Sequence, residues 1–184
     1  MIIPAYNEEE SILNTVMSIV EYRKKVDFDL DYVVINDGSV DRTKEILDSH
    51  HLNAIHLVMN LGIGGAVQTG YKYALEKDYD VAVQFDGDGQ HDIESLDALL
   101  EPIRRQQADL VVGSRFIGDK SSEFQTTFMR RFGITIISAF IKLTTGKRIL
   151  DTTSGYRLAN RDIIRQFAAR YPIKYPEPES IVHI

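Results

Sequence analysis

The sequence contains no cysteine, and this absence removes several kinds of chemistry. Disulfide bonds, thiolate metal sites and cysteine nucleophiles are excluded, which fits a reducing compartment such as the cytoplasm. The first residues, Met1 to Pro4, lack the basic and apolar regions of a signal peptide, so nothing indicates export. No window approaches the roughly 20 apolar residues that a membrane-spanning helix needs. We therefore predict a cytoplasmic protein, soluble or peripheral at the cytoplasmic face of a membrane.

An excess of positive charge is also missing. The chain has 21 Lys and Arg against 27 Asp and Glu, a formal net charge of -6 at pH 7. Because most of such a surface would repel a phosphate backbone, broad nucleic-acid binding is not expected. With 184 residues, 43% of them hydrophobic, the chain can bury one ordinary core, so we expect one domain. A very short first strand and the stop just after Glu177 to Glu179 leave truncation at either end open.

Apolar runs of strand length alternate with stretches of helical period, the pattern of a parallel sheet covered by helices on both faces. Fold class α/β follows. We expect strands at Met1–Ala5, Leu30–Asn36, Ala54–Val58, Asp80–Phe85 and Leu110–Gly113. We expect helices at Ile12–Val20, at Thr43–Ser49 behind a cap at Asp41, at Gly64–Glu76, and at Ile93–Gln106 with a kink at Pro102.

Polar loops follow the expected strands, where open parallel sheets bind their ligands. These loops hold the candidate chemistry: residues 4–8, 36–39, 60–65 and 86–91. In the last one, Asp86 and Asp88 flank a glycine at the end of an apolar strand, so both can aim oxygens at one Mg²⁺ or Mn²⁺, and Gln90 could add a carbonyl oxygen. Such a pair arises by chance in roughly half of chains this long. Its place at a strand end favours metal binding over an aspartate-rich turn.

Two further loops are candidates for binding a nucleotide. Gly62, Gly64 and Gly65 would let a backbone approach a phosphate at a helix start, yet they follow the third strand and lack the acidic partner of a dinucleotide fingerprint. A tight turn with close helix packing explains them equally well. Asp37, at the end of the second strand, is the better candidate for binding a base or ribose, with helix capping as its structural alternative.

Residues 125–150 are basic within an acidic protein, with five Lys or Arg and no acidic residue. The centre, Phe132–Leu143, is too short to span a bilayer but is suited to lie in its interface. A core helix with solvated ends is the alternative.

These motifs, with Gly113-Ser114-Arg115 and Asp151 to Arg157, resemble the family-2 glycosyltransferases, and within that family the polyprenyl-phosphate group that contains dolichol-phosphate mannose synthase. The resemblance spans residues 2 to about 160. It implies a Rossmann-like nucleotide-diphospho-sugar transferase (GT-A) fold with a mostly parallel sheet. It also implies a donor core at 1–124 and an acceptor-side extension of the same domain at 125–184.

The resemblance also implies roles for particular residues. The donor nucleotide-sugar would be bound by Pro4, Ala5, Tyr6, Glu8, Asp37, Asn60, Gly65, Asp86, Gly87 and Arg115. A Mg²⁺ or Mn²⁺ ion would be held by Asp86, Asp88 and Gln90, with Asp88 catalytic. Arg131 and Arg157 would lie near the acceptor phosphate. The family often has Lys or Arg near the position of Ile63, and its absence here leaves the donor open, with UDP-glucose or UDP-N-acetylglucosamine as first trials.

The expected reaction is a metal-dependent, inverting transfer of a hexosyl or N-acetylhexosaminyl group to a polyprenyl phosphate at a membrane surface. A membrane-protein subunit is a further candidate partner. An anionic phosphate acceptor needs positioning and no strong base. A sugar hydroxyl, as in cell wall polysaccharide or lipid-linked glycan synthesis, needs one, and Asp151 is the candidate by resemblance. Asp151 could instead cap a helix or pair with Arg157. A nucleotidyltransferase and a noncatalytic nucleotide-sugar sensor are remoter alternatives.

Overall fold

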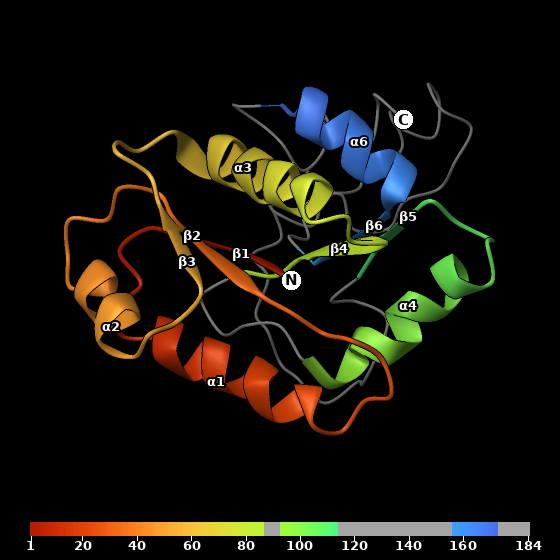
Figure 1. Cartoon of the computed structure of the whole chain (residues 1–184), viewed down its shortest axis with the longest axis horizontal. Helices are drawn as coiled ribbons and strands as arrows, with labels where there is room; N and C mark the ends of the chain where they lie inside the picture. The colour runs from red at the N-terminus through yellow and green to blue at the C-terminus, as the bar shows by residue number, and fades with distance from the viewer. Residues whose placement is uncertain (87–92, 114–155, 173–184) are drawn as a thin grey trace, which may run out of the picture.

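The computed structural model describes residues 1–86, 93–113 and 156–172, which form three layers with one sheet in the middle (Figure 1). The strands are β1 (Ile2–Ala5), β2 (Val33–Asn36), β3 (Ala54–His56), β4 (Val81–Gln84), β5 (Leu110–Val112) and β6 (Arg157–Asn160). The helices are α1 (Ile12–Arg23), α2 (Thr43–Ser49), α3 (Gly62–Glu76), the short 3₁₀ turn η1 (Ile93–Ser95), α4 (Leu96–Arg104) and α6 (Arg161–Ala169).

The sheet has the strand order β3-β2-β1-β4-β6-β5 within the described chain. β1, β2, β3 and β4 are mutually parallel, whereas β6 runs antiparallel to both β4 and β5. The prediction of a mostly parallel α/β sheet is therefore confirmed. The sequence analysis missed β6 and α6, because a four-residue strand that begins with Arg157 has no apolar run to reveal it.

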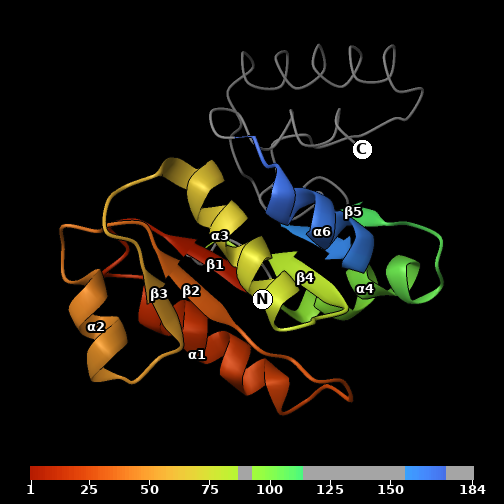
Figure 2. The same ribbon diagram turned by 45° about the horizontal axis from the view of Figure 1, so that its top comes forward.

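Successive side chains of each central strand enter opposite cores. Ile3 and Val34 face the core that α1 and α4 cover, while Ile2, Val33 and Ile35 face the core under α3 and α6. Figures 1 and 2 show these two helix pairs on opposite faces of the sheet. Side chains alternate in this way because a strand has a period of two, and burial of both faces explains why the predicted strands are continuous in Val and Ile.

Gly70 lets α3 lie close against β1. A Cβ atom at this position would stand 2.1 Å from Cγ2 of Ile2, which is closer than two carbons can approach. Any side chain here would push the helix away from the sheet and leave its apolar face less well packed.

Several predicted boundaries shift in the structure. β2 begins at Val33, three residues later than expected, and β3 and β4 are also shorter at their ends. α3 begins at Gly62 and not at Gly64, with the backbone N–H of Gly62 donating to Oδ1 of Asn60 at 2.9 Å. Pro102 lies inside α4, near its carboxyl end.

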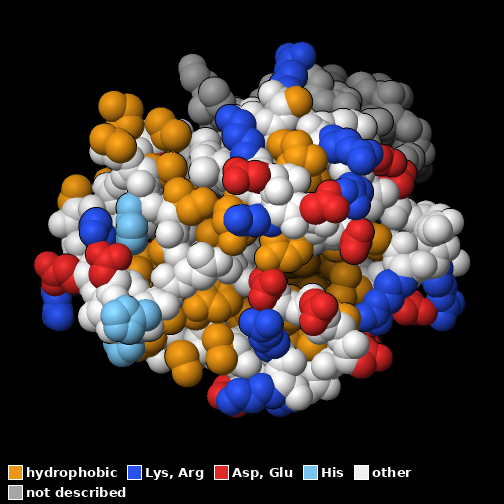
Figure 3. Space-filling model, viewed as in Figure 1, with side chains coloured by type: hydrophobic (Ala, Val, Ile, Leu, Met, Phe, Trp, Pro, Cys, Tyr) orange, Lys and Arg blue, Asp and Glu red, His pale blue; other side chains and the backbone are white. Residues whose placement is uncertain are grey.

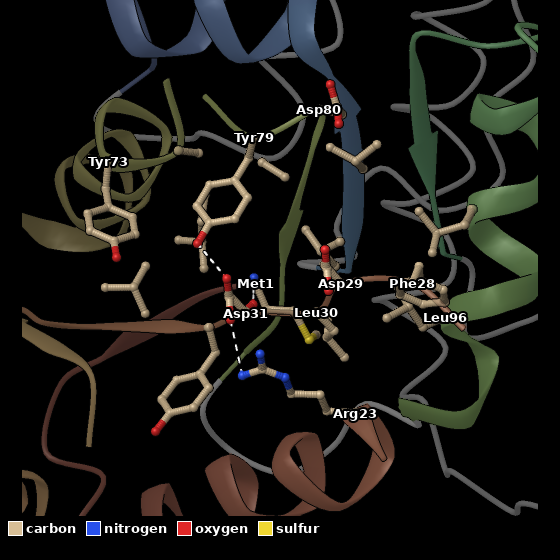
Figure 4. Close-up of a pocket in the computed structure, with 18 of the residues that line it drawn as sticks. Met1, Arg23, Phe28, Asp29, Leu30, Asp31, Tyr73, Tyr79, Asp80 and Leu96 are labelled. Carbon is tan, nitrogen blue, oxygen red and sulfur yellow. Dashed lines mark hydrogen bonds and ion pairs between the residues drawn. The ribbon is translucent and has the colours of Figure 1, made fainter. Parts of the chain in front are cut away.

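A hollow opens at the amino ends of the strands, where Met1, Asp31 and Tyr79 line it (Figure 4). Its polar groups pair with one another: the Tyr79 hydroxyl donates to Asp31 at 2.9 Å, and Arg23 forms an ion pair with Asp31 at 3.1 Å. This hollow lies at the opposite end of the sheet from the predicted site. Among the described residues, no helix combines the length and the apolar character needed to cross a membrane.

Candidate active site

The carboxyl edge of the sheet brings together motifs that lie far apart in the sequence. Ala5 pairs with Asn36, and Ile2 pairs with Gln84, so continuing that register places Asp86 level with Pro4. The carboxyl ends of β1, β2 and β4 therefore meet at one edge, with Asp86 the last described residue after β4.

The loops after β1 and β2 are joined by side-chain hydrogen bonds. The backbone N–H of Asn7 donates to Oγ of Ser39 at 3.0 Å, and the backbone N–H of Val40 donates to Oδ1 of Asn7 at 2.9 Å. Asn7 has a φ of 57°, a left-handed conformation that asparagine tolerates. These bonds fix the chain next to Tyr6, a residue predicted to contact the nucleotide.

A second set of bonds links the start of α1 to the start of α2. The backbone N–H of Glu8 donates to Oγ1 of Thr43 at 2.8 Å, and that of Glu9 donates to Oδ2 of Asp41 at 3.1 Å. Oδ1 of Asp41 accepts from the N–H of Thr43 at 3.0 Å and from its hydroxyl at 2.6 Å. The N-cap position of α2 is Arg42, one residue later than the predicted cap, and Asp41 binds a free backbone N–H at the helix start from just before it.

These contacts also set the acidity of Asp41. Burial alone would raise the pKa of its carboxyl, but hydrogen bonds from the Thr43 hydroxyl and from the backbone N–H groups of Thr43 and Glu9 outweigh burial and lower the pKa. The carboxylate that ties the two loops thus remains ionised at neutral pH.

Asp37 joins the loop after β2 to the start of α3. It is 3% exposed, and its Oδ1 accepts from the backbone N–H of Leu61 at 2.7 Å. Gly38, with φ at 67°, allows the two loops to touch, since a Cβ there would lie 2.8 Å from the backbone N of Asn60. The predicted nucleotide contact of Asp37 stays a prediction, and the structure adds this supporting role for one of its oxygens.

The remaining described donor residues differ in exposure. Pro4 and Ala5 are buried, Glu8 and Gly65 are partly buried, and Tyr6 and Asn60 are exposed. A Cβ at Gly65 would meet the Leu61 side chain at 2.5 Å, which supports the tight-turn alternative for this glycine. Their contacts with a donor stay predictions.

The antiparallel strand β6 carries a distant motif to the same edge. Arg157 pairs with Gln84 and with Val112, and the backbone N–H of Gly113 donates to the carbonyl of Tyr156 at 2.8 Å. The ring of Tyr156 lies edge-on to that of Phe85 with centroids 5.4 Å apart. The partly buried Asp86, next along from Phe85, thus lies near the end of the 151–157 motif.

Arg157 itself has 0% exposure and lies near the buried Tyr71. The pKa of the Tyr71 hydroxyl is raised, mainly by burial and then by Tyr171, and the positive charge of Arg157 opposes part of this rise. Contact between Arg157 and an acceptor phosphate stays a prediction, and the structure shows only that its side chain is buried within the fold.

Several predicted residues lie outside the described part of the chain: Gly87, Asp88, Gln90, Arg115, Arg131, Asp151 and the basic stretch with Phe132–Leu143. Among the described residues, no group of three His, Asp or Glu side chains could hold a metal ion. The predicted cation site is represented there by Asp86 alone.

Sequence reasoning missed the residues that tie the loops together, chiefly Asn7, Thr43 and His56. Asn7 lies in the predicted loop 4–8 and Thr43 at the predicted start of a helix, and their ability to hydrogen bond backbone groups was the available signal. His56 gave no local signal, because its partners lie on two other elements.

A mostly parallel α/β sheet with polar residues at its carboxyl edge defines the class of open α/β proteins, which bind their ligands at that edge. A family model described as Glycosyl transferase family 2 matches residues 1–167. The chain belongs to this family, which confirms the resemblance and the enzyme class predicted from the sequence.

Relatives in the family sharpen the resemblance. The chain is 35% identical over 170 residues to undecaprenyl-phosphate mannosyltransferase of Micrococcus luteus, covering 89% of this chain and 67% of the relative. It is 31% identical over 183 residues to UDP-N-acetylglucosamine–dolichyl-phosphate N-acetylglucosaminyltransferase of Methanococcus voltae, covering 90% and 70%. The predicted similarity to the polyprenyl-phosphate group is confirmed.

A solved structure supports the fold. Glucosyl-3-phosphoglycerate synthase of Mycobacterium tuberculosis, in complex with Mn²⁺, UDP-glucose and phosphoglyceric acid, matches with a TM-score of 0.63 at 20% identity. The match covers 88% of this chain and 55% of that protein, so the chain spans about half the length of this structural relative. The predicted GT-A fold is confirmed.

Proposed function

We propose that this chain carries the donor half, and part of the acceptor half, of an enzyme that transfers a sugar from a nucleotide-sugar to a polyprenyl phosphate. The observation that carries the proposal is the meeting of Asp37, Asp86 and Arg157 at one edge of the sheet, from three distant motifs. The names of the two relatives, each with a polyprenyl-phosphate acceptor, support this acceptor.

The donor is proposed to be a UDP-sugar, with its base and ribose between Tyr6, Glu8 and Asp37. Hydrogen bonds within the protein fix the loops after β1 and β2, which reduces the entropy that is lost when a ligand binds there. One relative is named for UDP-N-acetylglucosamine and another for mannosyl transfer, so the donor screen includes both UDP-sugars and GDP-mannose.

A divalent cation is proposed at Asp86, Asp88 and Gln90. Asp86 fits this role because it lies two residues beyond the end of β4, is partly exposed and carries hard carboxylate oxygens at the donor edge. When bound, Mg²⁺ or Mn²⁺ neutralises charge on the departing nucleoside diphosphate. The protein residues then have to orient the donor and keep water from its anomeric carbon.

The proposed chemistry is one direct displacement with inversion. An acceptor phosphate oxygen forms a bond to the anomeric carbon as the bond from that carbon to the donor diphosphate breaks, and the nucleoside diphosphate leaves. Because the acceptor oxygen is already anionic, Asp151 need not remove a proton. Arg131 and Arg157 contribute positive charge near the phosphates.

The acceptor is proposed to be reached at a membrane surface, and the apolar rim of the site supports this. We define the rim as the exposed side chains Tyr6, Val40, Val58, Met59, Leu61 and Ile63. Figure 3 shows apolar side chains gathered over the connection between β3 and α3. No Asp, Glu, Lys or Arg stands between Asp48 and Lys72, so this part of the rim can enter a lipid interface without desolvating a charge. A membrane-protein subunit remains a further proposed partner.

The decisive experiment is a donor screen with Mn²⁺ and polyprenyl phosphate in vesicles, following release of nucleoside diphosphate and of glycosylated lipid. We expect one donor to give both products in equal amounts. Release of neither product with any donor, although the protein binds nucleotide, would favour the noncatalytic sensor. Transfer to a sugar hydroxyl in place of the lipid phosphate would replace the proposed acceptor.

A further inference from the structure

A line of side-chain hydrogen bonds runs from helix α2 through β3 to the end of β2. Oδ1 of Asp48 lies 3.0 Å from Nε2 of His56, and Nδ1 of the same ring lies 3.0 Å from Nδ2 of Asn36. Oδ1 of Asn36 in turn accepts from the backbone N–H of Ser39 at 3.1 Å. The line therefore ends in the loop that Asp37 begins.

The outer contacts decide which atoms donate along this line. The backbone N–H of Ser39 can only donate, so the amide oxygen of Asn36 faces it and the amide NH₂ faces His56. Nδ1 of His56 must then accept, which leaves the ring proton on Nε2, where it donates to Asp48. The arrangement thus requires a neutral ring of one tautomer.

Asp48 is suited to accept that proton. The ammonium of Lys44 lies 2.6 Å from its Oδ2 and lowers the pKa of the carboxyl, and the hydrogen bond from His56 lowers it further. The outer end of the line is therefore an ionised acceptor, which favours the Nε2–H tautomer of the ring.

The inner end of the line reaches both donor loops. Asn36 is 2% exposed, so its amide has little access to water as an alternative partner. Ser39, held by Asn36, accepts the backbone N–H of Asn7 at 3.0 Å through its hydroxyl. A turned Asn36 amide would lose Ser39 and, through it, the contact with the loop that contains Tyr6.

We infer that His56 is a positioning residue for donor binding, whose neutral ring holds Asn36 and thereby the loops of Ser39 and Asn7 in the arrangement that receives the nucleotide. The inference rests on the proposed function, because the donor is the ligand of these loops. Protonation would make Nδ1 a second donor facing the Asn36 NH₂. The charged groups that hydrogen bonds connect to the ring are Asp48 and, through it, Lys44, both on α2.

Two substitutions separate the two ends of the ring. In His56→Asn, Oδ1 replaces Nδ1 as the acceptor facing Asn36, while the contact with Asp48 is lost. In His56→Gln, the longer amide can reach Asp48, while the acceptor facing Asn36 is lost. His50→Gln, at an exposed position outside the line, is the matched control.

Binding of UDP and of GDP, each with MnCl₂, is measured by calorimetry between about pH 5 and pH 8, where a histidine changes charge. We expect His56→Gln to weaken binding by about five- to tenfold, the equivalent of one hydrogen bond. His56→Asn and His50→Gln should stay within about twofold of the wild type. Both proteins should bind more weakly on acidification, because the terminal phosphate of the nucleotide gains a proton in this range, and the loss should be larger in the wild type than in His56→Asn. In turnover, the donor KM of His56→Gln should rise while kcat stays unchanged.

If the wild type binds a nucleotide and His56→Asn and His56→Gln bind it alike, the inference is overturned while the proposed function stands. If His56→Gln does not fold, the pH series decides, because an equal loss of binding on acidification in wild type and His56→Asn also overturns it. Failure of the wild type to bind either nucleotide is a separate result, which removes the proposed function and this inference together.

Discussion

The two halves of the site edge are held in different ways. On the side of β1, β2 and β3, short polar side chains such as Asn7, Asp37 and Asp41 bond neighbouring loops directly. On the side of β4, β5 and β6, antiparallel pairing and buried rings such as those of Phe85 and Tyr156 carry the arrangement. Local hydrogen bonds fix positions within the donor half, whereas the other half depends on strands from distant parts of the chain.

This difference separates two kinds of damage. A change in the donor loops should alter ligand binding while most of the core remains packed, because few apolar contacts depend on those loops. A change in β6 should lower the stability of the whole domain, because its side chains belong to both cores. The substitutions that follow test this contrast, beginning with the largest expected effect.

The strongest test compares the proposed cation ligand with the proposed acceptor residue. Asp88→Asn should lower turnover by about a thousandfold or more, since the cation is worth several kcal/mol to the departing nucleotide. Asp151→Asn should stay within about tenfold if the acceptor is a phosphate, because no proton has to be removed. Initial rates of nucleoside diphosphate release measure both. Asp80→Asn, at the far end of β4 with its side chain 93% exposed, is the control, and a large loss in Asp151→Asn would instead indicate a hydroxyl acceptor.

Leu158→Ala tests the half that depends on β6. Leu158 has 0% exposure and pairs with Val83 and Val111, so the cavity should lower the free energy of unfolding by about 2–5 kcal/mol. Nucleotide affinity of the folded fraction should change little. Urea denaturation followed by calorimetry measures both quantities, with the exposed Val40→Ala as control. A large loss of affinity without a loss of stability would contradict the contrast between the halves.

Gly38→Ala tests the close approach of the donor loops. The new Cβ would lie 2.8 Å from the backbone of Asn60, and φ is 67°, so we expect a cost of about 2–4 kcal/mol together with weaker nucleotide binding. Gly62→Ala is the matched control, because φ is 77° there but no atom lies within 4 Å of the new Cβ. Its cost should be about 1–2 kcal/mol. Equal losses in urea denaturation would show that close approach at Gly38 has no effect.

Asp41→Ala should cost about 0.5–2 kcal/mol, because backbone N–H groups of Glu9 and Thr43 at two helix starts lose their acceptor. Asp41→Asn gives the pH dependence. The pKa of Asp41 is lower in the folded state than in the unfolded state. Its contribution to the free energy of unfolding is therefore present above the unfolded pKa of about 3.9 and is lost as the pH falls through the lower folded pKa. Thermal unfolding across this acid range should show a smaller acid loss in Asp41→Asn than in wild type. Identical dependence of thermal unfolding on pH in the two proteins would show that the charge of Asp41 does not stabilise the link between the two loops.

Met59→Trp gives the mildest and most local test, because the chain contains no tryptophan. If the rim meets lipid, the fluorescence of this single reporter should shift to the blue with vesicles of anionic lipid and polyprenyl phosphate. Met17→Trp, at an exposed position on α1, is the matched control and should not shift. A shift at both positions, or at neither, would argue against a lipid contact through the rim.

The basic stretch is tested separately. Charge reversal at Arg130, Arg131, Lys147 and Arg148 should reduce retention of the protein by the same vesicles.

The sequence by itself determined the alternation of strands and helices, since the Val and Ile of β1 and β2 can be buried only on both faces of a sheet. It also determined that Asp37 and Asp86 stand at strand ends, because a polar residue directly after an apolar run marks that boundary. Asp41 could be recognised in the same way as a residue that binds the start of α2, and it does accept the backbone N–H of Thr43 there.

Only the tertiary structure decided that β6 returns antiparallel beside β4 and carries the end of the 151–157 motif to the same edge. The direction of a strand and its neighbours depend on packing between segments far apart in the chain, and no local pattern encodes them. The same holds for His56, whose two partners come from α2 and β2. Residue types specify what each loop can bond, whereas the sheet decides which loops come within bonding distance.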